Sequence, residues 1–558
     1  MACISKRKSP VMVAMAVILS MTMALAGCSS STGNEATGDE KTQTFTPQSG
    51  KADVTLNIAS GSENKEVAAA VQQAVDDSGV AVTLNYMGSL DIMQALERGG
   101  DSYDAVWPAS SMWISMGDTK HVVKEQRSTS TTPIVFGIAK SKAVELGWAD
   151  SNGTTKPVST QDLIKAVQDG SLTFSMTSAT QSNSGASAYL AFLTALAGKN
   201  QALTADDLND QTVLTNAKTL LSGVDRSSGS SDWLKDMVVA DSERFDSMVN
   251  YESLVIAADK QLVKAGKDPL LAVYPSDGIA VSDSPLGYVD RGQNLNDAYS
   301  KFAKALSSKQ AKLLFEQAGR RTGLGGTLSY ATDSKVKASF RAEWGINTSS
   351  DALKTIPLPA ANVIDKALDI YQRTLRKPSW TVWVVDYSGS MYGDGKDGVL
   401  GGLNAALEPN KAAQARIEPG DEDVNILIPF SSTAEQATKA TGSNTGQLLG
   451  VARETAADGG TNIYDGLRAA LADNMPSDPS HYTTAIVLMT DGQSETNDKD
   501  AFLESYKSSG FKPPIFSIMF GDADPSQLKD LASLSNAKVF DGRKGNLASV
   551  FRQVKGYN

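Results

Sequence analysis

The sequence predicts an α/β protein of several domains whose sheets are largely parallel. Three observations support this expectation. The chain has 558 residues, which is too long for a single small domain. From Asp53 onward, short runs of β-branched residues alternate with stretches of helical periodicity, the pattern of strand–helix–strand units. Small polar residues follow several of the strand-like runs, at the sheet edge where parallel α/β folds bind their ligands.

The composition narrows the classes of function. Hydrophobic residues make up 41% of the chain and charged residues 21%, so most of it can bury ordinary cores. The net charge is -11 and no basic stripe is present, which argues against binding to a nucleic-acid backbone. The two cysteines, Cys3 and Cys28, both lie near the N-terminus, so no disulfide or cysteine-bound metal organises the body.

The N-terminus has the order of an export signal. Lys6, Arg7 and Lys8 precede an apolar run over residues 11–26. The run ends in Leu-Ala-Gly-Cys at 25–28, which resembles the lipobox of bacterial lipoprotein precursors. This resemblance implies that residues 1–27 are a signal peptide and that Cys28 carries lipid, palmitate included, on the outer face of the cell membrane. An uncleaved anchor or a chance buried cysteine is the alternative.

A tether and a first folded body are expected next. Residues 28–51 are rich in Ser, Thr, Gly and Glu and lack aliphatic periodicity, which predicts a flexible tether. The first body then begins with strands at 53–58, 80–86 and 104–107 and helices at 64–75 and 90–97.

Residues 52–347 resemble a bacterial extracellular solute-binding protein of the two-lobed type. The resemblance lies in the order of several polar and strand-like segments, at 60–62, 103–111, 133–138, 175–177, 182–185 and 274–278. It implies a periplasmic-binding-protein-like (type II) domain, with two α/β lobes joined by a hinge and a small ligand in the cleft.

Hydroxyl and amide side chains at the strand ends are the candidates for holding that ligand: Ser60, Ser62, Ser89, Ser110, Ser182, Asn183 and Ser184. Asn183 and Ser184 precede a helix expected at 186–196, whose free N–H groups and positive dipole end suit an anion or a polar solute. The alternative role for these residues is helix capping, worth about 1 kcal/mol to the fold.

Residues 348–378 are expected to link this body to a second one. The segment 349–359 is polar and contains proline, and 362–376 repeats apolar residues on one helix face. We expect a connecting helix that leads into, or packs on, the second domain. A membrane or partner helix is the alternative.

The second body carries the motif with the clearest chemistry. A buried strand at 381–385 runs into Asp386, Ser388 and Ser390, on alternate residues of a tight loop. Thr461 opens a helix, and Asp491 follows a strand at 485–489. Oxygen ligands that converge from such loops suit Mg²⁺ or a similar divalent cation.

Residues 379–558 resemble a von Willebrand factor A (VWA) domain, a doubly wound Rossmann-like fold, and the five residues match its metal-ion-dependent adhesion site. The resemblance implies that Ser388, Ser390 and Thr461 supply hydroxyl ligands and that Asp386 and Asp491 supply charge to Mg²⁺, Mn²⁺ or Ca²⁺. It also implies an open coordination position for an Asp or Glu carboxylate of a partner protein.

Three functions compete at this stage. We expect a surface-anchored binding or adhesion protein that binds a partner protein through its VWA domain. A substrate-binding receptor of a membrane transporter is the alternative. An enzyme is not expected, because His121 and His481 lack a nucleophile signature and the predicted cation site holds only carboxylates and hydroxyls.

Overall fold

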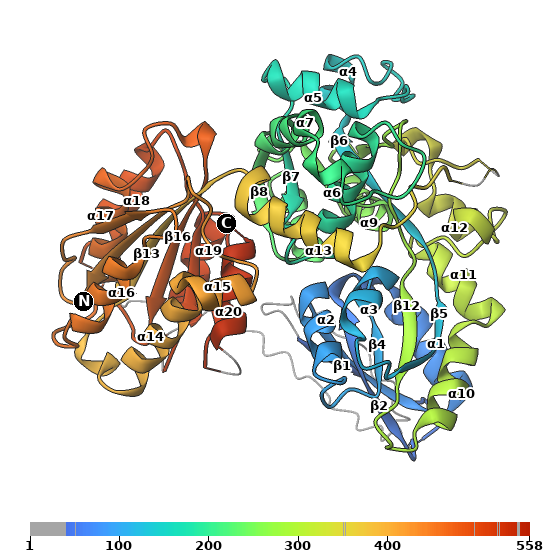
Figure 1. The fold of residues 1–558 in the computed structure, drawn as a ribbon, viewed down its shortest axis with the longest axis horizontal. Helices are drawn as coiled ribbons and strands as arrows, with labels where there is room; N and C mark the ends of the chain where they lie inside the picture. Colours follow the sequence, from blue (N-terminus) through green and yellow to red (C-terminus); the bar gives the residue numbers. More distant parts are fainter. Residues whose placement is uncertain are drawn as a thin grey trace, which may run out of the picture. The chain divides into compact units, whose positions relative to one another are not determined.

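The computed structural model describes residues 41–50, 52–349, 351, 353–495, 497–521, 523, 525–543 and 547–557. The predicted signal peptide, Cys28 and most of the predicted tether lie outside these residues. Within the described ranges, no helix is long and apolar enough to cross a membrane. Three six-stranded sheets organise this part of the chain (Figure 1).

The first sheet forms lobe 1 of the solute-binding-like body. Its strands, in spatial order, are β1 (Thr42–Phe45), β3 (Ala81–Met87), β2 (Thr55–Gly61), β4 (Ala105–Trp107), β12 (Pro285–Val289) and β5 (Val123–Ser128). β2 pairs in parallel with β3 and β4, whereas β12 returns from later in the chain and pairs antiparallel with β4. The helices of this lobe are α1 (Ala68–Ser78), α2 (Ser89–Glu97), α3 (Ser111–Gly117), α10 (Asn296–Leu306) and α11 (Lys309–Gln317).

The helix expected at 64–75 forms in two parts. A 3₁₀ turn, η1 (Ser62–Val67), leads into α1, and Gly79 ends α1 in the left-handed conformation with φ 71°. The Asn64 amide holds the turn, because it donates to Ser60 Oγ at 3.0 Å and to the Trp107 carbonyl at 3.2 Å. The polar segment at 60–62 is therefore fixed against the end of β4.

The second sheet forms lobe 2. Its strands, in spatial order, are β10 (Leu270–Val273), β6 (Thr132–Ala139), β9 (Ser247–Tyr251), β7 (Phe174–Thr177) and β8 (Val224–Ser228), with β11 (Val281–Ser282) paired to β6. β7 pairs in parallel with β8 and β9. The helices are α4 (Lys140–Glu145), α5 (Thr160–Gln168), α6 (Asn183–Leu196), α7 (Gln211–Ser222), α8 (Ser231–Ala240), α9 (Glu252–Lys264) and α12 (Ser334–Ser339).

Backbone hydrogen bonds join the segments that cross between the lobes. Thr131 and Arg321 exchange two such bonds, each of 2.8 Å, and Thr129 N donates to Ser284 O at 3.2 Å. The Arg321 guanidinium also pairs with Glu252, and both side chains are buried. The crossing is thus a multi-stranded hinge rather than a single linker.

The third sheet forms the C-terminal body. Its strands, in spatial order, are β15 (Thr438–Thr441), β14 (Val424–Phe430), β13 (Ser379–Asp386), β16 (Thr483–Thr490), β17 (Ile515–Met519) and β18 (Val539–Asp541). All neighbours pair in parallel except β15, which is antiparallel to β14. The helices are α14 (Asp394–Leu407), α15 (Pro409–Gln414), α16 (Gly446–Glu454), α17 (Ile463–Asp473), α18 (Lys499–Ser508), α19 (Pro525–Leu534) and α20 (Leu547–Gly556).

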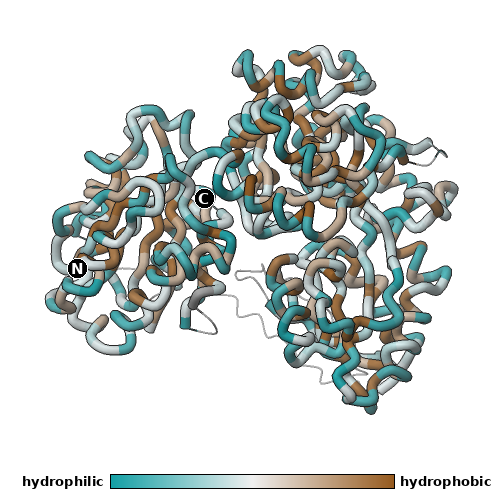
Figure 2. The backbone as a smooth tube through the Cα atoms, viewed as in Figure 1, coloured by the Kyte–Doolittle hydropathy of each residue, from teal (hydrophilic) through white to brown (hydrophobic). Residues whose placement is uncertain are grey.

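Alternation along β13 builds a core on each face of this sheet. Trp383 and Val385 join the cluster that includes residues of α14, α16 and α20. Val382 and Val384 join the cluster that includes residues of α17, α18 and α19. The hydrophobic colour of Figure 2 follows the central strands accordingly. The body is a doubly wound α/β fold, as the sequence predicts.

The connecting helix is α13 (Ala361–Ile370), which continues as a π turn, η5 (Tyr371–Leu375). It leads into β13, as expected, but its apolar face packs on lobe 2. Tyr189 of α6 donates its hydroxyl to Ala367 O at 3.0 Å, and its ring lies 5.2 Å from that of Tyr371. The first of the two expected roles, leading into the second domain, is therefore the one observed, and the apolar face of the helix completes the lobe 2 core.

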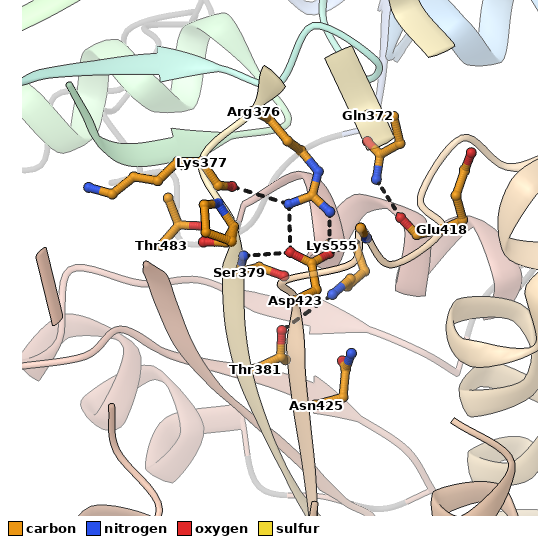
Figure 3. A network of polar contacts seen from close by, with 12 residues as sticks. Gln372, Arg376, Lys377, Ser379, Thr381, Glu418, Asp423, Asn425, Thr483 and Lys555 are labelled. Carbon is orange, nitrogen blue, oxygen red and sulfur yellow. Dashed lines mark hydrogen bonds and ion pairs between the residues drawn. The ribbon is translucent and has the colours of Figure 1, made fainter. Parts of the chain in front are cut away.

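An ion pair fastens the chain to the C-terminal body just after this helix (Figure 3). Arg376 donates to both oxygens of Asp423, which also accepts from Ser379 N at 2.7 Å. Burial raises the pKa of Asp423, but the charge and hydrogen bonds of Arg376 outweigh it, so the pKa falls below its usual value. Burial lowers the pKa of nearby Lys555, on α20, to about 8.

Candidate metal-binding site and ligand cleft

Parallel pairing brings the predicted metal ligands to one edge of the third sheet. Asp386 is the last residue of β13, and Val385 lies opposite Met489 on β16. Asp491 comes directly after β16, and Thr461 lies two residues before α17. The carboxyl ends of two central strands and one helix start therefore meet at this edge.

Direct contacts join four of the five residues. Ser390 Oγ donates to Asp491 Oδ1 at 2.9 Å, and the hydroxyls of Ser388 and Ser390 lie 3.1 Å apart. Asp386 Oδ1 accepts from the backbone N of Ser388 at 2.7 Å. The loop after β13 thus turns both hydroxyls toward the two carboxylates.

Thr461 faces the same point from the helix side. A Cβ atom added at Gly492 would lie 3.2 Å from Thr461 Oγ1 and 3.9 Å from Ser390 Oγ. Both hydroxyls therefore lie beside Gly492, a residue that has no side chain. The structure brings all five predicted residues into one cluster.

No positively charged side chain among the described residues pairs with the carboxylates of this cluster. Asp386 is fully buried and Asp491 is 9% exposed. Burial raises the pKa of Asp386, and the neighbouring Asp491 charge raises it further, while hydrogen bonds from Thr490 and Ser388 oppose the shift. Among the residues described, no Lys, Arg or His forms an ion pair with either carboxylate. Two carboxylates and three hydroxyls without a protein cation fit a hard divalent ion.

The hydroxyls are essential to that fit. The described part of the chain holds no group of three or more His, Cys, Asp or Glu residues placed to bind a metal. Any cation bound here would therefore take ligands from Ser388, Ser390 and Thr461 beside the two carboxylates.

Sequence reasoning missed one supporting residue, Thr490. Its Oγ1 donates to Asp386 Oδ2 at 2.6 Å and accepts from Gly492 N at 3.2 Å. Thr490 ends β16 beside Asp386, so the pairing of two parallel strands, which the sequence does not state, creates the contact. Its place directly before Asp491 is the only signal that the sequence offers.

The predicted ligand residues of the first body lie where the two lobes meet. Ser62 Oγ of lobe 1 is 3.3 Å from Ser230 Oγ of lobe 2. Asn183, at the start of α6 in lobe 2, accepts from Trp113 Nε1 of lobe 1 at 2.8 Å. The lobes are therefore in contact across the expected cleft.

Most of these side chains already have partners inside the protein. Ser182 and Ser184 share hydrogen bonds with Ser231, at 2.9 Å and 2.7 Å. Ser110 caps α3 by accepting from Met112 N at 3.3 Å. The other two, Ser60 and Ser89, are buried, and Ser60 Oγ donates to the Gly61 carbonyl at 3.2 Å. In this arrangement, with the lobes in contact, six of the seven side chains make hydrogen bonds within the protein, and Ser89 is buried.

Two carboxyl groups that the sequence analysis did not single out are buried near the same junction. Glu63 Oε1 and both carboxyl oxygens of Glu66 have no hydrogen-bond partner among the residues that the structure describes. Burial raises the pKa of Glu66 to about 8, and the charges of Lys235 and Arg320 only partly oppose it. In the sequence, both residues have the pattern of an exposed polar helix start. Only the tertiary fold shows that they are buried.

Comparisons with known proteins agree with the two bodies. Residues 56–321 match the family model of the bacterial extracellular solute-binding protein, and residues 382–553 match that of the von Willebrand factor type A domain. A comparison with curated proteins finds no match.

Several solved structures are similar at low sequence identity. The periplasmic binding protein P5PA is 13% identical, over 56% of this chain and 94% of that chain, with a TM-score of 0.38. The periplasmic binding protein AfuA from Actinobacillus pleuropneumoniae is 13% identical, over 57% and 98%, with a TM-score of 0.41. A von Willebrand factor type A protein from Catenulispora acidiphila is 20% identical, over 32% of this chain and 42% of that chain, with a TM-score of 0.27. On the two family-model matches alone, the chain combines a bacterial extracellular solute-binding domain at 56–321 with a von Willebrand factor A domain at 382–553.

Proposed function

We propose that this chain is a membrane-anchored lipoprotein that binds a partner protein through a divalent cation held by its VWA domain. One observation carries the proposal: Asp386 and Asp491 share a hydroxyl-lined cluster in which no Lys, Arg or His of the described ranges forms an ion pair with them. A cation such as Mg²⁺, Mn²⁺ or Ca²⁺ bound there supplies Lewis acidity and an open position for a partner's Asp or Glu carboxylate.

The surroundings of the cluster suit protein recognition. Tyr392 lies two residues beyond Ser390 and is 84% exposed, although large aromatic side chains usually gain stability from burial. Exposed tyrosines are common anchors of protein interfaces. A partner that presents a carboxylate to the site would cover this ring.

The proposal is a binding function rather than catalysis. The five cluster residues are Asp, Ser and Thr, which offer the hard oxygen atoms that bind a divalent cation. Their hydroxyls donate to carboxylates or face one another, which orients them for binding a cation.

Calorimetric titration with Mg²⁺, Mn²⁺ and Ca²⁺ tests whether the cluster binds a divalent cation. Asp386→Ala should abolish binding and keep the fold, because the strand core before Asp386 is untouched. Asp394→Ala is the matched control, since Asp394 is an exposed acid just beyond the loop. A pull-down of cell-envelope proteins in Mg²⁺ or in EDTA tests whether a partner protein binds through that cation. A partner bound equally well in EDTA would contradict the metal bridge.

A second function, capture of a small polar solute for a membrane transporter, is favoured by the unpartnered carboxyl oxygens of Glu63 and Glu66. A solute with hydrogen-bond donors, bound between the lobes, would satisfy these oxygens. Thermal melts across sugars, amino acids and oxyanions test it, because a ligand at 100 times its Kd adds about 2.7 kcal/mol of stability. If no class of solute raises the melting temperature, solute capture is contradicted and only the proposed binding function of the VWA domain remains.

A further inference from the structure

A cavity of about 520 Å³ lies between lobe 2 and the VWA domain, apart from both sites described above. Asp225 and Arg226 of β8 line it from lobe 2, and Thr483 and Thr484 line it from the start of β16. The Asp386 site lies at the other end of the same sheet. The eight residues of β16 separate the two places by roughly 23 Å.

Direct contacts hold the two walls of this cavity together. Arg226 donates through Nη2 to Asn536 O at 2.6 Å, and Ser227 Oγ donates to Gly556 O at 3.1 Å. The rings of Trp233 and Tyr557 meet edge to face with centroids 4.8 Å apart. The size of the cavity is therefore set by packed and hydrogen-bonded elements on both sides.

The lining is strongly positive. Its charged members are four cations against one carboxylate, a formal balance of +3, namely Arg226, Arg244, Lys377 and Lys512 against Asp225. None of the four cations forms an ion pair with a residue that the structure describes. Burial lowers the pKa of Arg226 to about 9 and also lowers that of Lys377, and the charge of Asp225 only partly opposes either shift.

Two buried polar atoms in the lining have no hydrogen-bond partner in the part of the chain that the structure describes. Arg226 is 5% exposed and its Nε has no hydrogen-bond acceptor, and Thr484 is 7% exposed and its Oγ1 has no partner. The Arg226 guanidinium is held against the rings of Trp233 and Phe516, at 5.8 Å and 5.3 Å. Buried donors are rarely left unpaired, so this part of the lining is poised to meet an acceptor.

We propose that this cavity binds a small metabolite that carries a multiply charged oxyanion, as in a phosphate ester or a polycarboxylate. Arg226 and Thr484 donate to the oxyanion inside the cavity, and the exposed side chains of Arg244 and Lys512 attract it. The volume falls within the range of about 300–1,000 Å³ that is typical of small-molecule pockets. Because the ligating residues come from both bodies, the bound anion ties lobe 2 to the VWA domain.

Calorimetry on the full-length protein tests this with three probes: glycerol 3-phosphate, citrate and the neutral compound glycerol. We expect at least one of the two anions to bind at one site per chain, more weakly as salt is raised, and glycerol not to bind. If neither anion binds at low ionic strength, or if glycerol binds as well as glycerol 3-phosphate, the proposal is wrong.

Variants separate this cavity from any anion site in the interlobe cleft. Arg244→Ala combined with Lys512→Ala removes two exposed charges and should weaken anion binding at least tenfold. Lys507→Ala is the matched control, because Lys507 is an exposed lysine of α18 that does not line the cavity. Thr484→Val keeps the shape of a lining residue and should weaken binding several-fold. Unchanged affinity in both the double variant and Thr484→Val would overturn the assignment.

Discussion

Thr490 donates a hydrogen bond of 2.6 Å from Oγ1 to Oδ2 of Asp386, across the two central parallel strands of the VWA sheet. The backbone N of Ser388 donates to the other oxygen, Oδ1, at 2.7 Å. Both bonds favour the ionised carboxylate and oppose the burial that raises its pKa. Thr490 is therefore a positioning residue that fixes the direction in which Asp386 faces the cluster.

We predict that Thr490→Val weakens Mg²⁺ binding by about 10–100-fold, the usual cost of losing a group that orients a metal ligand. Valine keeps the shape and the β-strand preference of threonine, so the fold should persist. Thr490→Ser restores the hydroxyl and should restore most of the affinity. Calorimetric titration of the three proteins decides it, and equal affinity in wild type and Thr490→Val would contradict the role.

Glu66 should make the stability of the first domain depend on pH. Burial raises its pKa to about 8 from 4.5, so the folded state holds a proton that the unfolded chain releases. The stabilising contribution is fully present below pH 4.5 and is lost as pH rises toward about 8. A pKa difference of one between the folded and unfolded states corresponds to about 1.4 kcal/mol.

We therefore predict that Glu66→Gln, which mimics the protonated form, flattens the fall in stability between about pH 5 and about pH 8. Thermal melts of the full chain across that range measure it. Glu97→Gln, on the exposed end of α2, is the control for loss of one carboxylate. If the two variants show the same pH profile, Glu66 is ionised and solvated in the folded state.

The VWA cluster was predictable from sequence because its signals are local. Asp386, Ser388 and Ser390 follow one apolar run, and Asp491 follows another, so assigning two adjacent parallel strands is enough to bring them together. The doubly wound order of the sheet follows from the same alternation of strands and helices. Thr490 escaped notice because its role depends on which strand is its neighbour.

The first domain was predictable in architecture but not in chemistry. Its strands appear within about three residues of the expected bounds. The buried carboxyl groups of Glu63 and Glu66 and the contact of Ser62 with Ser230 depend on how two lobes meet, and no local pattern encodes that. The same holds for the packing of α13, because an amphipathic helix shows which face is apolar but not what covers it.

The lipobox leads to a prediction about processing. Cys28→Ser should leave the signal peptide uncleaved or release the protein from the membrane, because the lipid is attached to the sulfur atom of Cys28. Mass analysis of the membrane-bound wild-type form should show a chain that begins at a lipid-bearing Cys28. Residues before Cys28 without lipid on the membrane-bound chain would refute the proposed anchoring.

The ion pair between Arg376 and Asp423 should be critical for the junction of the two domains (Figure 3). Asp423 accepts from Arg376, Ser379 N and Gly420 N, and both members of the pair are largely enclosed. Asp423→Ala leaves Arg376 and the neighbouring Lys555 buried without an anion, so we expect a loss of about 3–5 kcal/mol in the stability of the VWA domain and its junction with lobe 2.

The same ion pair makes stability depend on pH. Because the native pair lowers the pKa of Asp423, its stabilising contribution is present above the usual carboxyl range and is lost as pH falls through the lowered pKa. Denaturant unfolding near neutral pH measures the loss. Asp421→Ala, an exposed acid two residues away, should change stability by less than about 0.5 kcal/mol, and similar effects of the two substitutions would show that the pair does not hold the junction.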